Sequence, residues 1–345
     1  KATAWHATLW LSALCPFTAR HASLPLTECP TIFLLALALW AAVRFVDCRC
    51  WSHALTFTAA VSYAALLRPD GALVAVALCP VLIVSLLKNQ TPHRWKMISA
   101  CVLLALAPFA AWTWRNWQAF HVFQPLAPES ATDPGNPTFP GWDRWVKTWA
   151  LDFDSTYSVY WNVPDDRLEL QYVPARAFDD ESERAATAKL AQQYNQNGYQ
   201  LTSQLDAGFA ALAQKRIAQA PMRYYLWLPL GRVADMWLRP RVESLPIDLD
   251  WWVYPNHPDE TILSWTYLVL NALYLILGLA GFFLLRRTPG AIVAWAMLAY
   301  MLLRSAALAV TVVSPEARYT LECFPLLFVL GGSAVAWGRT KLRRP

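Results

Sequence analysis

Long apolar segments separated by charged connections constrain the fold of this chain more than any other feature. A helix needs about 20 apolar residues to cross a bilayer. Charged residues make up only 15% of the chain, against about a quarter in soluble domains. The pattern predicts an all-α polytopic membrane protein. The predicted segments cover 3–18, which is short, 25–43, 51–67, 72–87, 97–114, 262–285, 291–313 and 319–337.

A polar stretch interrupts this series and divides the chain into three predicted parts. Residues 1–117 and 261–345 form transmembrane helices, and 118–260 form a large, partly helical loop domain. Within the loop, 179–218 is predicted to be helical with a break near Asn197-Gly198. Residues 222–238 are apolar but contain Arg232 and Asp235, so we expect an interfacial or re-entrant segment and not a crossing.

The distribution of charge predicts the orientation of the chain. The loop domain holds 19 acidic and 12 basic residues, and the rest of the chain holds 5 and 17. The lysines and arginines cluster in every second connection between the apolar segments. Their excess therefore indicates membrane topology and not a nucleic-acid-binding patch. By the positive-inside rule, 44–52, 88–96, 286–290 and the C-terminal tail face the cytoplasm. The loop domain and the turns at 20–28, 68–71 and 314–318 then face outward.

Several charged residues fall at the predicted outer helix ends. In Arg68-Pro69-Asp70-Gly71, proline disfavours the helical conformation of the preceding residue and glycine accepts most backbone geometries, so a tight bend is expected. These residues either cap helices and pair with each other or form a substrate site. Glu28 either caps its helix or contacts a substrate. Arg115 and Asn116 are either an interfacial anchor beside neighbouring tryptophans or a phosphate site. The last candidates either anchor a helix or form part of the site: Glu316, Arg318 and Tyr319.

One charge lies within a predicted span, and no motif predicts a metal site. Arg304 is in the middle of 291–313, so it must face the bundle interior, where we expect a buried structural partner such as a backbone carbonyl. Cys48-x-Cys50 lacks the spacing and partners of a zinc site. Four loop acids, which we interpret as solvated, lack the spacing of a calcium site: Asp152, Asp154, Asp165 and Asp166. Of the tryptophans at 142, 145, 149, 161, 251 and 252, most are expected in a core.

A set of short motifs, in one order along the chain, resembles a known enzyme family. They are Leu26-Thr27-Glu28, Arg68-Pro69-Asp70-Gly71, Trp114-Arg115-Asn116, and Glu316-x-Arg318-Tyr319 with Pro325 six residues on. Together they resemble glycosyltransferase family 39, enzymes of the GT-C fold related to protein O-mannosyltransferases and the lipid A aminoarabinose transferase. The likeness covers nearly all of the chain and implies a GT-C-like helical bundle with a periplasmic loop domain.

The resemblance also implies an activity and a location. It implies sugar transfer from a polyprenyl-phosphate-linked donor to a lipid, protein or glycan acceptor at the periplasmic face of a bacterial inner membrane, with the C-terminus cytoplasmic. Arg68, Arg115 and Arg318 would bind the donor phosphate within one cavity. Some relatives use a divalent metal, but no metal or other cofactor is predicted here.

The family places its general base shortly after the first transmembrane helix. This sequence begins Lys1-Ala2-Thr3, without an initiator methionine or a signal-peptide pattern. We therefore expect the chain to be an N-terminally truncated fragment, with the base upstream of Lys1 and activity in doubt.

Two other classes of function fit parts of the pattern. A polytopic transporter or flippase for a lipid-linked saccharide would also use an intramembrane arginine and outward-facing charges, but it predicts inverted repeats, which the sequence does not show. A non-catalytic scaffold that presents the acidic loop to a partner would leave the outer arginines without a common pocket.

Overall fold

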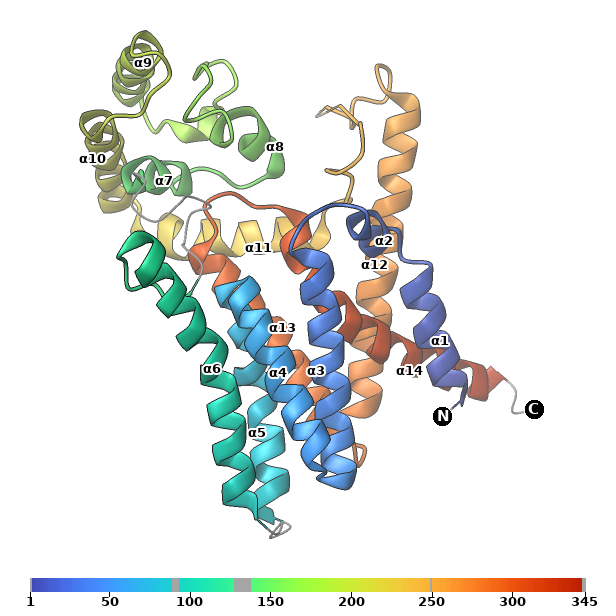
Figure 1. The fold of residues 1–345 in the computed structure, drawn as a ribbon. Helices are drawn as coiled ribbons and strands as arrows, with labels where there is room; N and C mark the ends of the chain where they lie inside the picture. Colours follow the sequence, from blue (N-terminus) through green and yellow to red (C-terminus); the bar gives the residue numbers. More distant parts are fainter. Residues whose placement is uncertain (1, 89–92, 127–137, 249, 343–345) are drawn as a thin grey trace. The chain divides into compact units, whose positions relative to one another are not determined.

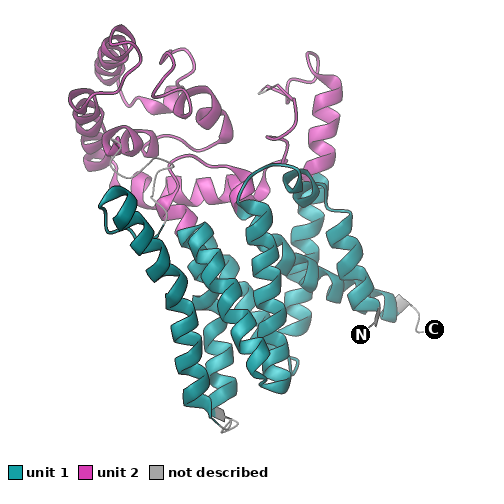
Figure 2. Cartoon of the chain, viewed as in Figure 1, with its two compact units in different colours: residues 1–135, 269–306, 320–345 teal, residues 136–268, 307–319 magenta. Residues whose placement is uncertain are grey.

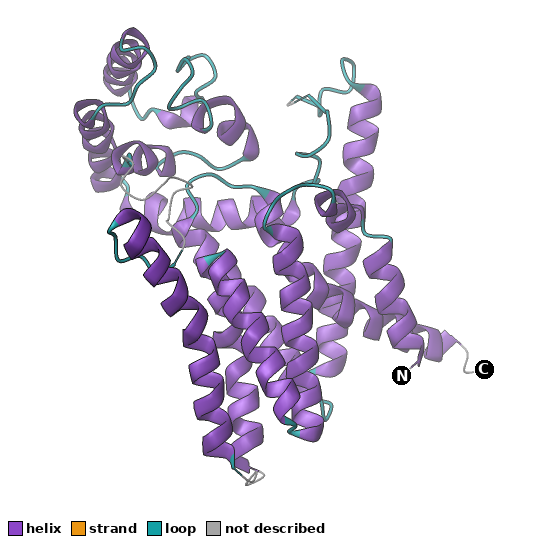
Figure 3. Cartoon of the chain, viewed as in Figure 1, coloured by secondary structure: helices purple, strands orange, loops and turns teal. Residues whose placement is uncertain are grey.

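The structure is a computed structural model that describes residues 2–88, 93–126, 138–248 and 250–342. Every regular element in these ranges is helical (Figure 3). The chain divides into two compact units (Figure 2): unit 1 comprises 1–135, 269–306 and 320–345, and unit 2 comprises 136–268 and 307–319. The predicted loop domain, 118–260, overlaps unit 2 from residue 136 onward.

The described residues contain six helices that are long and apolar enough to cross a membrane. They lie at Glu28–Cys48, Pro69–Leu87, Arg94–Phe120, Pro258–Leu285, Ala291–Thr311 and Ala317–Lys341. A seventh predicted segment forms α4 (Trp51–Leu67), which has 17 residues and ends where the sequence predicts. The prediction of an all-helical, multi-pass membrane protein is confirmed at this level.

Within unit 1, neighbouring helices pack side by side (Figure 1). Helix α4 packs against α3 (Glu28–Cys48) and against α6 (Arg94–Phe120), and α5 (Leu73–Lys88) packs against α3. Helix α12 (Pro258–Leu285), helix α13 (Ala291–Thr311) and the 3₁₀ helix η5 (Ala317–Cys323) each begin in one unit and end in the other.

The predicted first segment, 3–18, is two helices and not one. Helix α1 (Ala2–Ala13) has 12 residues and packs against α14 (Phe324–Leu342), and α2 (Pro16–Ala22) follows. Pro16 occupies the first turn of α2, where its missing N–H costs nothing, and Cys15 before it is extended. The proline therefore ends the first helix early.

Unit 2 is built from helices around an aromatic core. Helix α7 (Pro140–Lys147) packs against α10 (Ser203–Gln219), which packs against α9 (Glu181–Gln196). As predicted, 179–218 is helical with a break: α9 ends at Gln196, and Gly198 adopts a positive φ of 65°. The other helical turns of the unit are α8 (Phe153–Ser155), η2 (Thr156–Tyr160), η3 (Ala175–Ala177), η4 (Arg223–Trp227) and α11 (Leu228–Leu238).

Three of the six tryptophans singled out in the loop are core residues, and Trp251 is half-buried. Trp142, Trp145 and Trp149 are at most 2% exposed. The rings of Trp142 and Trp145 pack against Phe209 of α10, and the ring of Trp149 packs against Trp145. The prediction is wrong for Trp161 and Trp252, which are 47% and 56% exposed. Trp161 packs edge-on against Phe153 and Tyr157, which lie outside the aromatic core.

Two buried arginines tie the segments of unit 2 together. Arg216 donates to Glu183 Oε2 at 2.9 Å, to Thr148 Oγ1 at 3.0 Å and to two backbone carbonyls. Arg232 donates to the carbonyls of Lys147 and Ala150 at 3.1 and 3.2 Å. Residues 222–238 are thus a helical segment of unit 2 and are not one of the six apolar helices. Arg232, which interrupts their apolar pattern, anchors them to the end of α7.

Asp235 gives a pH prediction for this segment. Its Oδ2 accepts a hydrogen bond from Arg239 at 3.2 Å, but burial raises the pKa of Asp235 to about 6 despite the Arg239 charge. Between about pH 4 and 6 the folded protein therefore holds a proton that the unfolded chain has lost, so this group stabilises the fold as the pH falls. Relative to Asp235→Asn, the wild type should gain about 2–3 kcal/mol of stability between pH 7 and pH 4.

Thermal unfolding of the two proteins in detergent, from pH 4 to pH 7, measures this difference. Every other carboxylate is common to both proteins, so the difference isolates the titration of Asp235. A difference in unfolding midpoint that stays constant across this pH range would contradict the prediction.

Candidate functional site

The bend predicted at Arg68-Pro69-Asp70-Gly71 is present and places two charged side chains beside each other. Arg68 is extended, with φ −148° and ψ 127°, as expected before proline, and it ends α4. The chain then turns through the 3₁₀ helix η1 (Pro69–Ala72), where the Gly71 N–H donates to the Arg68 carbonyl at 2.8 Å. A side chain at Gly71 would collide with the backbone of α4 at Ala64, so the tight bend requires glycine.

Five charged residues of unit 1 meet at this bend, and we call them the charged cluster: Glu28, Arg68, Asp70, Arg304 and Glu322. Arg68 Nη1 lies 3.5 Å from both Glu28 Oε1 and Glu322 Oε1, and Arg68 Nε lies 3.4 Å from Asp70 Oδ1. Arg304 Nη2 lies 3.1 Å from Glu322 Oε2, and Arg304 Nη1 pairs with Asp70 Oδ2. Residues from α3, the α4–η1 bend, α13 and η5 thus form one ionic network.

The charged cluster has a buried back and an accessible rim. The side chains of Arg304 and Glu322 are fully buried and that of Glu28 is 4% exposed, whereas those of Arg68 and Asp70 are 18% and 29% exposed. Three carboxylates face two guanidinium groups. A ligand that approaches this cluster would meet Arg68 and Asp70 first.

The two arginines of the charged cluster lie at different distances from their carboxylate partners. Ion pairs between guanidinium and carboxylate groups are normally about 2.7–2.9 Å long. Arg304 approaches Glu322 at 3.1 Å and Asp70 more closely still, but the measured contacts of Arg68 with its three acids are 3.4–3.5 Å. Arg304 is therefore the buried counter-ion of the network, and Arg68 is the more exposed cation at its rim.

Two sequence interpretations change here. Arg304 is buried, as predicted, but carboxylates are its charged partners and not a backbone carbonyl alone. Glu322 was not among the predicted site residues. The sequence contained the information needed to predict it, because Glu322 lies inside the apolar segment 319–337. A charge within a membrane-spanning segment is costly and must face the bundle interior, and this argument applies to Glu322 as it does to Arg304.

Glu28 opens α3, as predicted. The Thr27 side chain before it makes no capping hydrogen bond. Glu28 is buried and contacts Arg68 across the helix pair. Its carboxylate also lies in the first turn, where the helix dipole favours a negative charge.

Arg115 and Asn116 form a separate site near the end of α6. Arg115 Nη1 donates to Asn116 Oδ1 at 2.9 Å, and its guanidinium stacks 5.3 Å from the Trp112 ring and 5.1 Å from the Phe120 ring. Asn116 is 2% exposed and donates to the Gln124 carbonyl. This pair fixes the chain where it leaves α6, which fits the anchoring interpretation, while Arg115 itself is exposed.

The predicted residues near 316 form a third group, in unit 2. Glu316 is 5% exposed. Its Oε1 accepts hydrogen bonds from Arg318 Nη2 at 3.1 Å and from the Tyr319 hydroxyl at 2.5 Å, and Arg318 Nε forms an ion pair with its Oε2 at 2.6 Å. Tyr160 donates to Asp143 Oδ1 at 3.1 Å. Burial, followed by the charge of Asp143, raises the pKa of Tyr160, and Glu316 adds to this shift. Tyr160 therefore stays a neutral hydrogen-bond donor in this group.

The eight predicted site residues thus fall into three groups. Glu28, Arg68 and Asp70 belong to the charged cluster, Arg115 and Asn116 stack near the end of α6, and Glu316, Arg318 and Tyr319 belong to unit 2. Arg68 and Arg115 engage different partners. A single cavity shared by Arg68, Arg115 and Arg318 stays a prediction.

One group of side chains has the composition of a cation site. Asp248, Asp250 and His257 each offer a ligand atom within 4.8 Å of the others. Both acids are exposed, and His257 lies 3.5 Å from Asp248 and 3.2 Å from Asp250, so the three side chains already contact one another directly. Asp152 is one of the four loop acids that were predicted to be solvated. Its side chain caps α8 and forms an ion pair with Arg176 at 2.7 Å.

Comparisons with protein-family models, with curated proteins and with solved structures find no match to this chain.

Proposed function

We propose that this protein is a membrane glycosyltransferase of the GT-C type that uses a polyprenyl-phosphate-linked sugar donor. The observation that carries the proposal is the rim of the charged cluster, where Arg68 and Asp70 lie together at a helix end in front of a buried ionic network. Ionisable residues inside membrane helices are costly and therefore mark functional sites by default.

The rim supplies the two groups that such a transfer needs. A guanidinium pairs with phosphate oxygens through two parallel hydrogen bonds and stabilises the charge that develops on the leaving phosphate. The Arg68 side chain is 18% exposed at the rim, so an anionic phosphate can reach its guanidinium group. Asp70, held by Arg304 from behind, can accept hydrogen bonds from sugar hydroxyls.

One other predicted residue has a supporting place in this proposal. Arg115, which is exposed beside Trp112 in the same unit as Arg68, is an additional candidate ligand of the phosphate. The acceptor is a lipid, protein or glycan, and the reaction takes place at the periplasmic face of a bacterial inner membrane, with the C-terminus in the cytoplasm. The lysines and arginines after α12 and in the last turns of α14 support that orientation.

A second candidate is a transporter or flippase for a lipid-linked saccharide. The observation that favours it is the excess of carboxylates over guanidinium groups in the charged cluster, since an unbalanced carboxylate inside a membrane protein can take up a proton or cation during transport. The transporter would bind the same kind of lipid-linked saccharide as the glycosyltransferase. It would move that saccharide across the membrane intact instead of transferring its sugar to an acceptor.

Binding and product analysis on the protein in nanodiscs and liposomes separate these candidates. A glycosyltransferase should bind polyprenyl phosphate more tightly than the uncharged polyprenyl alcohol and should convert a polyprenyl-phosphate sugar to polyprenyl phosphate. Movement of the intact donor across the liposome membrane would support the transporter. Equal affinity for the phosphate and the alcohol would contradict both, because each requires recognition of the phosphate.

A further inference from the structure

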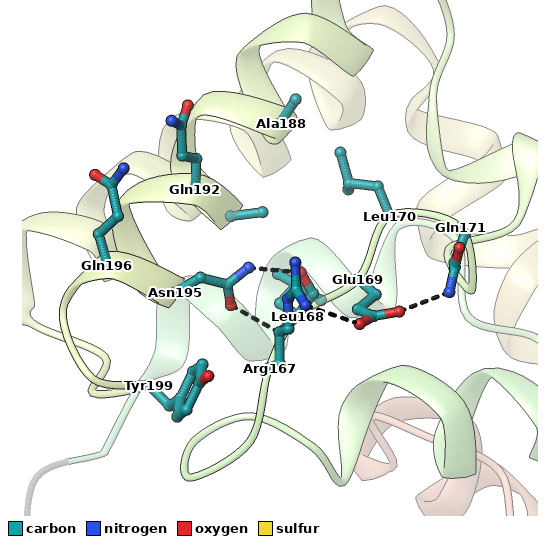
Figure 4. Close-up of a pocket in the computed structure, with 11 residues that line it drawn as sticks. Arg167, Leu168, Glu169, Leu170, Gln171, Ala188, Gln192, Asn195, Gln196 and Tyr199 are labelled. Atoms are coloured by element: carbon teal, nitrogen blue, oxygen red, sulfur yellow. Dashed lines mark hydrogen bonds and ion pairs between the residues drawn. The ribbon is translucent and has the colours of Figure 1, made fainter.

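Unit 2 contains a cavity that the proposed transfer reaction does not use. Its volume is about 820 Å³, within the usual range of ligand pockets. One wall is α9 and the other is the segment 167–171, and Tyr199 closes one end (Figure 4). All of these residues belong to unit 2.

The two walls are fixed to each other by hydrogen bonds. The Asn195 side chain, from the last turn of α9, accepts from the Leu168 N–H and donates to the Leu168 carbonyl, both at 3.0 Å. The Tyr194 hydroxyl donates to the Asp166 carbonyl at 2.7 Å. Leu168 itself is 3% exposed and belongs to the core of the unit. The cavity is therefore a built feature of the fold and not a chance gap beside a loose loop.

Amide groups dominate the polar lining of this cavity. Gln192 and Gln196 are four residues apart, so they project from the same face of α9, and Ala188 one turn earlier leaves space beside them (Figure 4). Both glutamines are exposed, and no hydrogen bond within the described residues occupies either side-chain amide. Each amide offers two donor hydrogens and one acceptor oxygen to a ligand.

The charges in the cavity are balanced. Arg167 Nη1 lies 3.5 Å from Glu169 Oε1, and Gln171 donates to Glu169 Oε2 at 2.6 Å (Figure 4). One cation and one anion line the cavity and neutralise each other. The lining therefore has no excess of positive charge for a phosphate or a nucleic acid, and it favours an uncharged ligand.

Tyr199 adds an aromatic surface at one end of the cavity. It is 37% exposed, and its ring lies 6.3 Å from the ring of Tyr194, which is fully buried. An exposed tyrosine ring supported by a buried ring presents an apolar face next to a polar hydroxyl. Such a face suits the C–H side of a sugar ring, while the hydroxyls of the same sugar meet the amides.

From these features we infer that the cavity between α9 and residues 167–171 binds a neutral carbohydrate chain. A lipid would find too little apolar lining. An extended peptide is commonly held by a free strand edge or by apolar side-chain pockets, and neither lines this cavity within the described residues. The inference does not depend on the proposed transfer reaction, because binding is measured without a donor.

Calorimetric titration of the protein in nanodiscs tests the inference. The probes are three neutral tetrasaccharides, composed of mannose, glucose or N-acetylglucosamine, and a tetrapeptide of serine and glutamine. Saturable binding of at least one tetrasaccharide is expected. The double variant Gln192→Ala/Gln196→Ala should weaken that binding about tenfold, because two hydrogen bonds are lost. Tyr199→Asn should also weaken binding and can keep the positive φ of 61°.

Gln193→Ala is the matched control, because Gln193 is an exposed glutamine on the same helix that does not line the cavity. It should bind like the wild type. The inference is overturned if no tetrasaccharide binds, if the peptide binds more tightly than every tetrasaccharide, or if Gln193→Ala weakens binding as much as the double variant. Unchanged thermal unfolding midpoints will show that all variants are folded.

Discussion

Replacing Arg304 by methionine is expected to destabilise the membrane-embedded unit by about 3–5 kcal/mol, the cost of removing one partner from a buried ion pair. Methionine approximates the length of the arginine stem, so the main change is the loss of charge. Glu322, which is fully buried, and Asp70 would lose their shared counter-ion. The unfolding midpoint in detergent, followed by circular dichroism, measures the effect.

A double-variant experiment separates the ion pair from general damage to the helix packing. If the Arg304–Glu322 contact carries the effect, Arg304→Met combined with Glu322→Gln should destabilise the protein less than the sum of the two single changes. The matched control is Arg287→Met, since Arg287 is exposed after α12 and its replacement should change stability by less than about 0.5 kcal/mol. Strict additivity of the two changes would exclude the pairing as the cause.

Replacing Arg68 by methionine is expected to weaken the binding of polyprenyl phosphate about 10- to 150-fold, which corresponds to one or two hydrogen bonds to a charged group. The stability should fall less than for Arg304→Met, because Arg68 is 18% exposed and its contacts are longer. Arg68→Lys keeps the charge but not the planar fork, so its affinity should lie between those of methionine and the wild type.

Binding of fluorescent polyprenyl phosphate to the protein in nanodiscs measures the effect of the Arg68 changes. Arg94→Met is the control, because Arg94 begins α6 on the connection predicted to face the cytoplasm. It should leave the affinity unchanged. If Arg68→Met binds the lipid phosphate as tightly as the wild type, Arg68 is not its ligand and serves only the ionic network.

Rules that depend only on neighbouring residues predicted the membrane-spanning helices and the bend at Arg68-Pro69 well. The apolar segments became helices because every backbone group in a bilayer needs an internal partner, and Arg68 left the helical conformation because Pro69 follows it. The same rules failed at 3–18, where Pro16 divides one apolar segment into two helices. They also failed for Trp161, whose exposure depends on which face of a short turn meets the core.

The sequence by itself determined the class of the protein and the identity of its charged helix ends, because hydrophobicity, proline and charge act over a few residues. Only the tertiary structure decided which of those charges meet. It joined Arg304 and Glu322 to Glu28, Arg68 and Asp70, and it paired α9 with residues 167–171 to form the cavity. Partners so far apart along the chain are chosen by helix packing, which no local pattern encodes.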